Sequence, residues 1–214
     1  MKKLIWLITS VLVVTIGASF SPKNKKEKWI KLFDGKSLNG WKVGENAASF
    51  KVEDGVIVVN GPRAHLFYDG KIGDHNFRNF EFKAQVMTTP GSNSGIYFHT
   101  EYQEGGWPSK GYEVQVNNSH TDWRRTGSLY AIQDVKDVFV DDNVWYTEYI
   151  KVEGKHITIK INDKTVVDYI EPEGIERSKG NENRKIGSGT FALQGHDPKS
   201  KVYYKDIMVK LLAD

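Results

Sequence analysis

Three short segments of alternating side chains constrain the fold of this chain more than any other feature. In Ser94–His99, Gly111–Val116 and Thr190–His196, apolar residues alternate with polar ones. Successive side chains of a β-strand point to opposite faces, so each segment is predicted to be a strand with one apolar face and one polar face. The polar face carries Tyr97, His99, Glu113, Gln115, Gln194 and His196. Exposed sheet faces normally carry Thr, Lys and Ser, so this combination indicates a functional site.

The same alternation recurs along the chain, and no long helical periodicity is found. Further predicted strands cover residues 50–53, 56–59, 80–86, 145–152, 156–161, 165–169 and 202–209. Turn-forming residues separate them at Glu53–Gly55, Glu153–Lys155 and Asn162–Lys164. The segment 145–169 is predicted to form a three-stranded meander, while 105–110, 117–127 and 171–189 are predicted loops. Closely spaced short strands of this kind predict an all-β sandwich or barrel.

The N-terminus has the pattern of a secretory signal peptide over residues 1–19. Positively charged Met1–Lys3 precedes an uncharged apolar run from Leu4 to Ile16, and small residues follow. That run is shorter than the roughly 20 residues of a membrane span, although an uncleaved anchor is the alternative. Residues 20–28 form a polar linker, and 29–214 suit a single domain. We therefore expect an exported protein, periplasmic or at the cell surface of a bacterium, without a stable span after signal removal.

The charge balance and cysteine content exclude some classes of partner and fold. The chain has 30 Lys and Arg against 27 Asp and Glu. Removal of two lysines with the signal peptide leaves 28 against 27, a net charge of +1. A near-neutral surface argues against nucleic acid as a partner. Because the chain has no cysteine, burial of apolar surface has to stabilise the fold. The pattern does not predict an oligomeric state.

Several ordered motifs resemble the 3-keto-disaccharide hydrolase and 3-keto-glucoside 1,2-lyase domain family. They are Leu32–Trp41, Phe50–Val56, Asn93–Tyr97, Gly111–Gln115, Thr126–Tyr130 and Lys205–Ile207, and the resemblance runs from about residue 29 to 212. It implies a concanavalin A-like jelly roll with two curved antiparallel sheets and a carbohydrate on the concave face. It also implies cleavage of 3-keto-glycosides, in some members by 1,2-elimination followed by hydration. Retaining β-glucanases on this fold carry Glu-x-Asp-x-x-Glu, whereas residues 113–118 keep only the first carboxylate.

A keto group at C3 changes the catalytic groups that bond cleavage requires. It acidifies the C2 proton, and the glycosidic oxygen at C1 then becomes a leaving group. One general base and an electrophile are sufficient for this elimination. We expect Glu113 to be the base or a metal ligand, and His99 and His196 to transfer protons or to hold a divalent cation with it. No nucleotide cofactor is expected, because Gly187–Gly189 lacks a strand–helix context.

The remaining candidates are expected to bind the saccharide. Gln115 and Gln194 are suited to hydrogen bonds with hydroxyl groups, and loop tryptophans to stacking on sugar rings. The complete set of predicted binding residues is Tyr97, Gln115, Gln194, Trp107, Trp123, Arg124 and Lys110. Each has a structural alternative: the glutamines can bridge strands, the tryptophans can close the end of a sandwich, and Glu113 can pair with Lys110 or Arg125.

Three functions are compatible with the sequence. The first is an exported enzyme that acts on 3-keto-glycosides. The second is a non-catalytic carbohydrate-binding module of the same fold, in which Glu113 binds hydroxyl groups and no base is needed. The third is a structural or interaction protein of the cell surface, for which the polar cluster is incidental.

Overall fold

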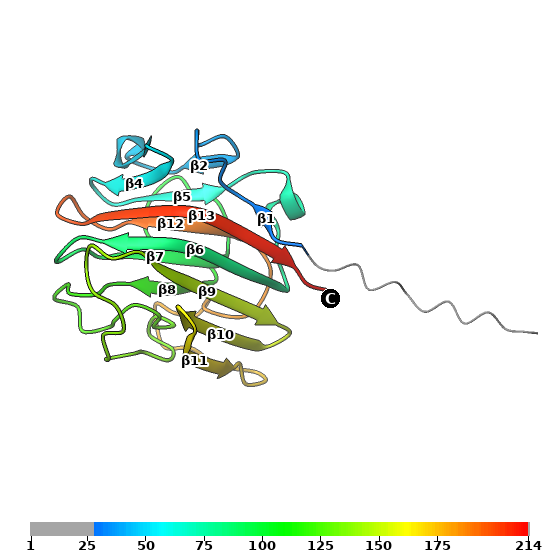
Figure 1. Ribbon diagram of the computed structural model, residues 1–214. Coiled ribbons are helices and arrows are strands. Elements are labelled where there is room, and N and C mark those ends of the chain that lie inside the picture. Colours follow the sequence, from blue (N-terminus) through cyan, green and yellow to red (C-terminus); the bar gives the residue numbers. More distant parts are fainter. Residues whose placement is uncertain (1–27, 214) are drawn as a thin grey trace, which may run out of the picture.

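The computed structural model describes residues 28–213, and within them two antiparallel sheets pack face to face (Figure 1). The predicted signal peptide and nearly all of the predicted linker lie outside these residues. Short 3₁₀ turns at Ala47–Ser49 (η1) and Ile72–His75 (η2) are the helical elements of the described part. None of the helical segments in this range has the length and apolar character needed to cross a membrane. The all-β jelly-roll class expected from the sequence is confirmed.

The larger sheet has eight strands, with the spatial order β11-β10-β9-β6-β13-β4-β3 and β1 beside β13. Their bounds are β1 Ile30–Lys31, β3 Phe50–Glu53, β4 Val56–Asn60, β6 Phe80–Thr88, β9 Tyr146–Glu153, β10 His156–Ile161, β11 Lys164–Ile170 and β13 Lys201–Leu211. Strands β9, β10 and β11 are joined by two tight turns and pair antiparallel. The predicted meander over 145–169 is therefore confirmed.

The smaller sheet has five strands, in the order β2-β5-β12-β7-β8. These are β2 Trp41–Val43, β5 Ala64–Tyr68, β7 Ser94–Thr100, β8 Tyr112–Val116 and β12 Thr190–Gly195. In the register Tyr97 lies opposite Glu113, and Ala192 lies opposite both Tyr97 and Phe67. The three segments that sequence alternation singled out are thus neighbours in one sheet.

The core lies between the sheets and follows the predicted alternation. Apolar side chains of β7, β8 and β12, such as Phe98, Val114 and Leu193, are fully buried against those of β6, β9 and β13. A smaller cluster of Phe67 and Tyr97 around Ala192 packs on the opposite, outer face of the five-stranded sheet. This outer face carries the polar side chains of the candidate site.

Residues 101–110 lie between β7 and β8 in the chain, and they form a strap that crosses the outer face of the five-stranded sheet. At its far side, Gly106 donates its amide to Glu45 Oε1 at 3.0 Å, and Arg63 Nε pairs with the same oxygen at 2.7 Å. Gly44 approaches the strap so closely that a Cβ there would lie 2.6 Å from the carbonyl oxygen of Gln103. The strap is therefore fixed to the opposite edge of the sheet.

Candidate functional site

A cavity of about 440 Å³ opens on the outer face of the five-stranded sheet. Its floor consists of polar side chains from β7, β8 and β12. Its walls come from the tip of the strap and from the loops after β8 and before β12. The lining residues include Asn93, Tyr97, Trp107, Glu113, Gln115, Asp122, Tyr130, Arg184, Gln194 and His196. Six residues predicted from the sequence are therefore brought together here: Tyr97, Trp107, Glu113, Gln115, Gln194 and His196.

Glu113 lies at the centre of the floor and is 5% exposed. Tyr97 donates its hydroxyl to Glu113 Oε2 at 2.8 Å, and Gln194 donates Nε2 to Oε1 at 2.9 Å. Gly95 lies beside this carboxyl group, since a Cβ at that position would be 2.7 Å from Oε1. Burial raises the pKa of Glu113, while the charge of Arg184 and the two hydrogen bonds oppose that shift. A carboxyl group whose pKa moves toward neutrality is suited to proton transfer.

His196 forms a dyad with the next residue, Asp197. The Nδ1 atom of His196 lies 2.8 Å from Asp197 Oδ2, and that oxygen also accepts the hydroxyl of Ser200 at 2.7 Å. Partial burial raises the pKa of Asp197, but the hydrogen bonds from His196, Ser200 and the Lys199 amide outweigh it and lower the pKa to about 2. The ionised carboxylate holds the proton of His196 on Nδ1, so Nε2 remains available for proton exchange.

Arg184 brings a positive charge to the same carboxyl group. Its Nη2 is 3.6 Å from Glu113 Oε2, and its Nη1 donates to the carbonyl oxygen of Tyr130 at 3.2 Å. The guanidinium carbon lies 5.1 Å from the centroid of the Tyr130 ring. Arg184 lies in the loop before β12. The polar residues around it in the sequence gave no signal that could have identified it as a site residue. A fixed cation in a cavity can stabilise negative charge that develops on a substrate oxygen.

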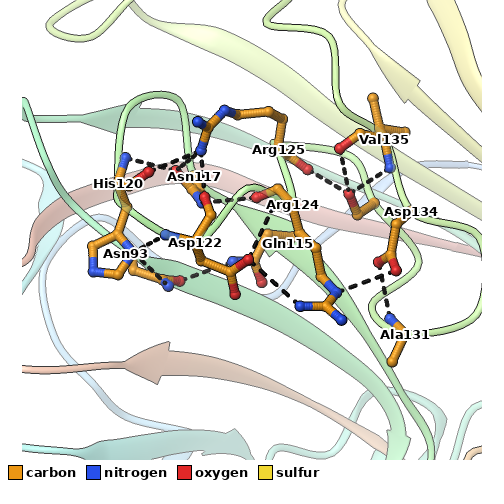
Figure 2. Close-up of polar contacts among 11 residues, drawn as sticks. Asn93, Gln115, Asn117, His120, Asp122, Arg124, Arg125, Ala131, Asp134 and Val135 are labelled. Atoms are coloured by element: carbon orange, nitrogen blue, oxygen red, sulfur yellow. Dashed lines mark hydrogen bonds and ion pairs between the residues drawn. The ribbon is translucent and has the colours of Figure 1, made fainter.

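A chain of hydrogen bonds connects Gln115 to the loop after β8, as Figure 2 shows. Gln115 Nε2 donates to Asn93 Oδ1 at 3.0 Å, and Asn93 Nδ2 lies 3.3 Å from His120 Nδ1. The amide of Asp122 also donates to His120 Nδ1, at 3.1 Å. Two donors therefore face Nδ1, which places the proton of a neutral His120 on Nε2. Sequence alternation did not identify His120, because it lies in a loop.

The side chains of His120, His196 and Asp197 form a group in which one potential ligand atom of each lies within 4.8 Å of the others. Hydrogen bonds already hold this group together, because Asp197 Oδ2 pairs with His196 Nδ1 and two donors face His120 Nδ1. The expected metal set of Glu113, His99 and His196 does not converge, because His99 lies outside the cavity.

Two acceptor atoms of the cavity lack a partner among the described residues. Both are glutamine side-chain oxygens, Oε1 of Gln115 and Oε1 of Gln194. In each case the amide nitrogen is already committed within the floor, to Asn93 and to Glu113 respectively. Buried acceptors without a partner carry a desolvation cost that a bound donor removes. Sugar hydroxyl groups are donors of this kind.

His99 does not belong to the cavity, contrary to the expectation from strand alternation. The backbone of His99 adopts a left-handed conformation with φ 54°, which breaks the alternation at the end of β7. The ring packs 5.7 Å from Phe80, its Nε2 lies 2.9 Å from the carbonyl oxygen of Arg78, and its Nδ1 accepts the amide of Gly187 at 3.2 Å. Burial lowers the pKa of His99 to about 4. It is a neutral structural histidine.

Three other predicted binding residues also lie outside the cavity lining. Trp123 is 45% exposed and stacks with Arg124, whose guanidinium carbon is 4.9 Å from the indole ring. Arg124 itself pairs with Asp134 and Asp122, so it supports the wall behind the cavity (Figure 2). Lys110 pairs with Glu101 at 3.3 Å and lines a second cavity farther along the sheet.

The fold and the cavity define a concanavalin A-like β-sandwich with acid–base groups on the outer face of one sheet. The chain belongs to the family described as the 3-keto-alpha-glucoside-1,2-lyase-like domain, whose model matches residues 28–210. The family resemblance expected from the sequence motifs is therefore confirmed.

Individual relatives are consistent with this family. A protein named 3-keto-disaccharide hydrolase from Bacteroides thetaiotaomicron is 39% identical over 168 residues, which are 66% of this chain and 58% of that protein. The chain thus matches little more than half the length of this relative. A candidate glycosyl hydrolase from Parabacteroides distasonis has a TM-score of 0.72 at 25% identity, covering 86% of this chain and 94% of its own. A carbohydrate-binding module of Bacillus subtilis shares the fold, with a TM-score of 0.55 at 12% identity, over 80% of this chain and 95% of its own.

Proposed function

We propose that this protein is an enzyme that cleaves 3-keto-glycosides at C1 in the cavity above β7, β8 and β12. The observation that carries the proposal is the convergence of the buried Glu113 carboxyl group and the His196–Asp197 dyad on one cavity. The family, and a relative named 3-keto-disaccharide hydrolase, support a carbohydrate substrate that carries a keto group. The saccharide is the partner that this site requires.

Glu113 removes the proton from C2 of the sugar in the first step. The resulting charge is delocalised onto the C3 oxygen, where Arg184 stabilises it. The electron pair then forms the C1=C2 bond, the C3 carbonyl is restored, and the bond from C1 to the glycosidic oxygen breaks. Protonated His196, held through Nδ1 by Asp197, transfers the Nε2 proton to the leaving oxygen. Addition of water across C1=C2 completes a net hydrolysis. Without that addition the reaction is a lyase reaction.

The decisive experiment is the replacement of Glu113 by Gln, which keeps the shape of the side chain and removes its basicity. We expect kcat on a 3-keto-disaccharide to fall by about 10²–10⁴-fold, the usual contribution of a general base, with little change in ligand affinity. Formation of the unsaturated ketone product and release of reducing sugar are the measurements. Glu176→Gln, at an exposed position, is the matched control. A wild-type protein that binds the sugar but never turns it over would instead indicate the binding module.

The same assay tests the divalent cation expected from the sequence. The proposed reaction requires no divalent ion, because Glu113 acts as the base, Arg184 stabilises the negative charge on the C3 oxygen and His196 acts as the acid. We expect activity to be retained after treatment with EDTA. If EDTA abolishes activity and added Mn²⁺ or Mg²⁺ restores it, this part of the proposal is wrong.

We also propose that the protein is exported to the periplasm or cell surface of a bacterium. The support is the pattern of residues 1–19, in which a positively charged start precedes an uncharged apolar run. The N-terminal sequence of the protein recovered from the periplasmic fraction would test this, since an intact Met1 there would contradict removal of a signal peptide.

A further inference from the structure

The cavity of the proposed active site extends across the strands, from the edge of the five-stranded sheet to its middle. At the edge, the amide of Tyr130 donates to the carbonyl oxygen of Glu113 at 3.0 Å, so the Tyr130 segment lies beside β8 as a further strand would. Three strand spacings, or about 14 Å, then separate this segment from β12. Tyr130 and His196, which follows β12 directly, both line the cavity. The cavity therefore has two ends, a Tyr130 end and a His196 end.

The Tyr130 end holds the positive charge that the proposed elimination uses. The guanidinium carbon of Arg184 lies 5.1 Å from the centroid of the Tyr130 ring, and Arg184 Nη2 is 3.6 Å from Glu113 Oε2. In the proposed reaction Glu113 takes the C2 proton and Arg184 stabilises the C3 oxygen. The ring that carries the keto group therefore lies at this end of the cavity.

The leaving group lies toward the His196 end. His196 protonates the glycosidic oxygen in the proposed reaction, and the leaving group extends from that oxygen away from the 3-keto ring. Beside His196 lies Trp107, with the two ring centroids 5.4 Å apart. Trp107 lines the same cavity and is 45% exposed. Aromatic side chains provide large apolar contact surfaces, so Trp107 is placed to stack with the leaving group.

The position of Trp107 is fixed before any substrate binds. The ring of His65 lies 5.6 Å from the indole ring, and the guanidinium carbon of Arg63 lies 5.5 Å from its centroid. Glu45 Oε1 accepts both Arg63 Nε at 2.7 Å and the amide of Gly106 at 3.0 Å. One carboxylate thus holds the cation beside the indole and the backbone next to Trp107. A contact surface that is ordered in advance binds its ligand at a lower entropic cost.

We propose that the His196 end is a subsite for a leaving group that contains a sugar ring, with Trp107 as the stacking surface and Glu45 as a positioning residue. The inference rests on the proposed function, because the direction of the substrate follows from the roles of Glu113, Arg184 and His196. It makes the preferred substrate a 3-keto-disaccharide rather than a 3-keto-glycoside with a small leaving group. The bond that breaks lies between the two ends of the cavity.

Replacement of Trp107 by Ala tests the subsite with two substrates that differ only in the leaving group. We expect kcat/KM on a 3-keto-disaccharide to fall by roughly 3- to 10-fold, mainly through KM, because one aromatic contact is lost. The same constant for the methyl 3-keto-glucoside should stay unchanged, because a methyl group does not extend to the indole. Trp107→Phe should recover part of the loss. Trp123→Ala is the matched control, since Trp123 is also 45% exposed but lies outside the cavity lining.

Replacement of Glu45 by Gln tests the positioning role. The variant keeps an oxygen for the Gly106 amide and removes the charge that pairs with Arg63. We expect KM for the 3-keto-disaccharide to rise, kcat to stay unchanged and the indole ¹H–¹⁵N signal of Trp107 to shift, with Glu176→Gln as the control. The double variant Glu45→Gln/Trp107→Ala should be no worse than Trp107→Ala alone. Effects that multiply instead would show that Glu45 acts elsewhere and would overturn its role.

Calorimetry with unoxidised sugars distinguishes a failure of this inference from a failure of the proposed function. If 3-keto-glycosides are cleaved but Trp107→Ala affects the disaccharide and the methyl glycoside equally, the subsite is wrong and the proposed function stands. If no 3-keto-glycoside is cleaved, the proposed function fails and binding decides on the subsite. Weaker binding of an unoxidised disaccharide by Trp107→Ala, with methyl glucoside unaffected, would then support a second sugar ring at Trp107. Equal binding by wild type and variant, or no binding by either, would contradict it.

Discussion

At the scale of single residues, Asp197 decides which nitrogen of His196 can exchange a proton with a substrate. Its Oδ1 accepts the Lys199 and Ser200 amides at 2.8 and 3.2 Å, while Oδ2 holds His196 Nδ1. The carboxylate is therefore oriented by its own turn before any substrate binds. Asp197 is a positioning residue, because it acts through the imidazole.

Asp197→Asn is expected to reduce kcat by about 10²–10⁴-fold, since an amide can also hold the imidazole in the opposite tautomer. KM should change little. The ¹⁵N shifts of the His196 ring report the tautomer directly, and a structural role alone would not alter them. Equal ring shifts and equal kcat in wild type and variant would contradict the role of Asp197.

The folded-state pKa of Asp197 also has a consequence for stability. Because that pKa is lowered from 3.8 to about 2, the carboxylate stabilises the fold above about pH 4. This contribution is lost as pH falls toward 2. Asp197→Asn should therefore show a smaller loss of stability between pH 4 and pH 2 than wild type, whereas Asp163→Asn, in an exposed turn, should behave like wild type.

At the scale of elements, alternation predicted most of the strands and most of the cavity floor, but it missed β1, β2 and β5. Tyr97, Glu113, Gln115 and Gln194 lie where a period of two places them, because β7, β8 and β12 are regular up to their ends. The same rule fails at His99, where the left-handed backbone turns the ring toward Phe80. Alternation describes a regular strand, so it cannot locate the residue at which a strand becomes irregular.

The walls of the cavity were less predictable than its floor. Arg184 reaches Glu113 from 71 positions along the chain, and the polar composition of its loop resembles that of ordinary surface loops. Residues 105–110 of the strap were predicted to be a loop with a functional tryptophan, and Trp107 does line the cavity. Trp123, from a loop of similar composition, does not. Loop conformation depends on contacts with distant elements, such as the strap with Glu45, and short-range patterns do not contain them.

At the scale of the whole molecule, the apolar layer between the sheets encloses a carboxyl group that the proposed reaction does not use. Glu148 of β9 is 0% exposed, and neither carboxyl oxygen has a hydrogen-bond partner within the described residues. Tyr146 and Tyr204, both buried, are the neighbouring titratable groups. Burial raises the pKa of Glu148 well above its usual value, so the group is folded in its neutral form.

This burial links the stability of the entire sandwich to pH. Below the ordinary pKa of glutamate both states are protonated, so no penalty exists. As pH rises, the unfolded chain ionises at Glu148 and the folded chain does not, so the free energy of unfolding falls by up to about 1.4 kcal/mol per pH unit until the folded-state pKa is reached. Glu148→Gln cannot ionise and should remove this decline. Urea unfolding at pH 5 and pH 8 measures the difference, with Glu176→Gln as the control. If wild type and Glu148→Gln lose the same stability between pH 5 and pH 8, Glu148 is not buried in its neutral form. A carboxyl group that is buried without a partner must make the free energy of unfolding depend on pH.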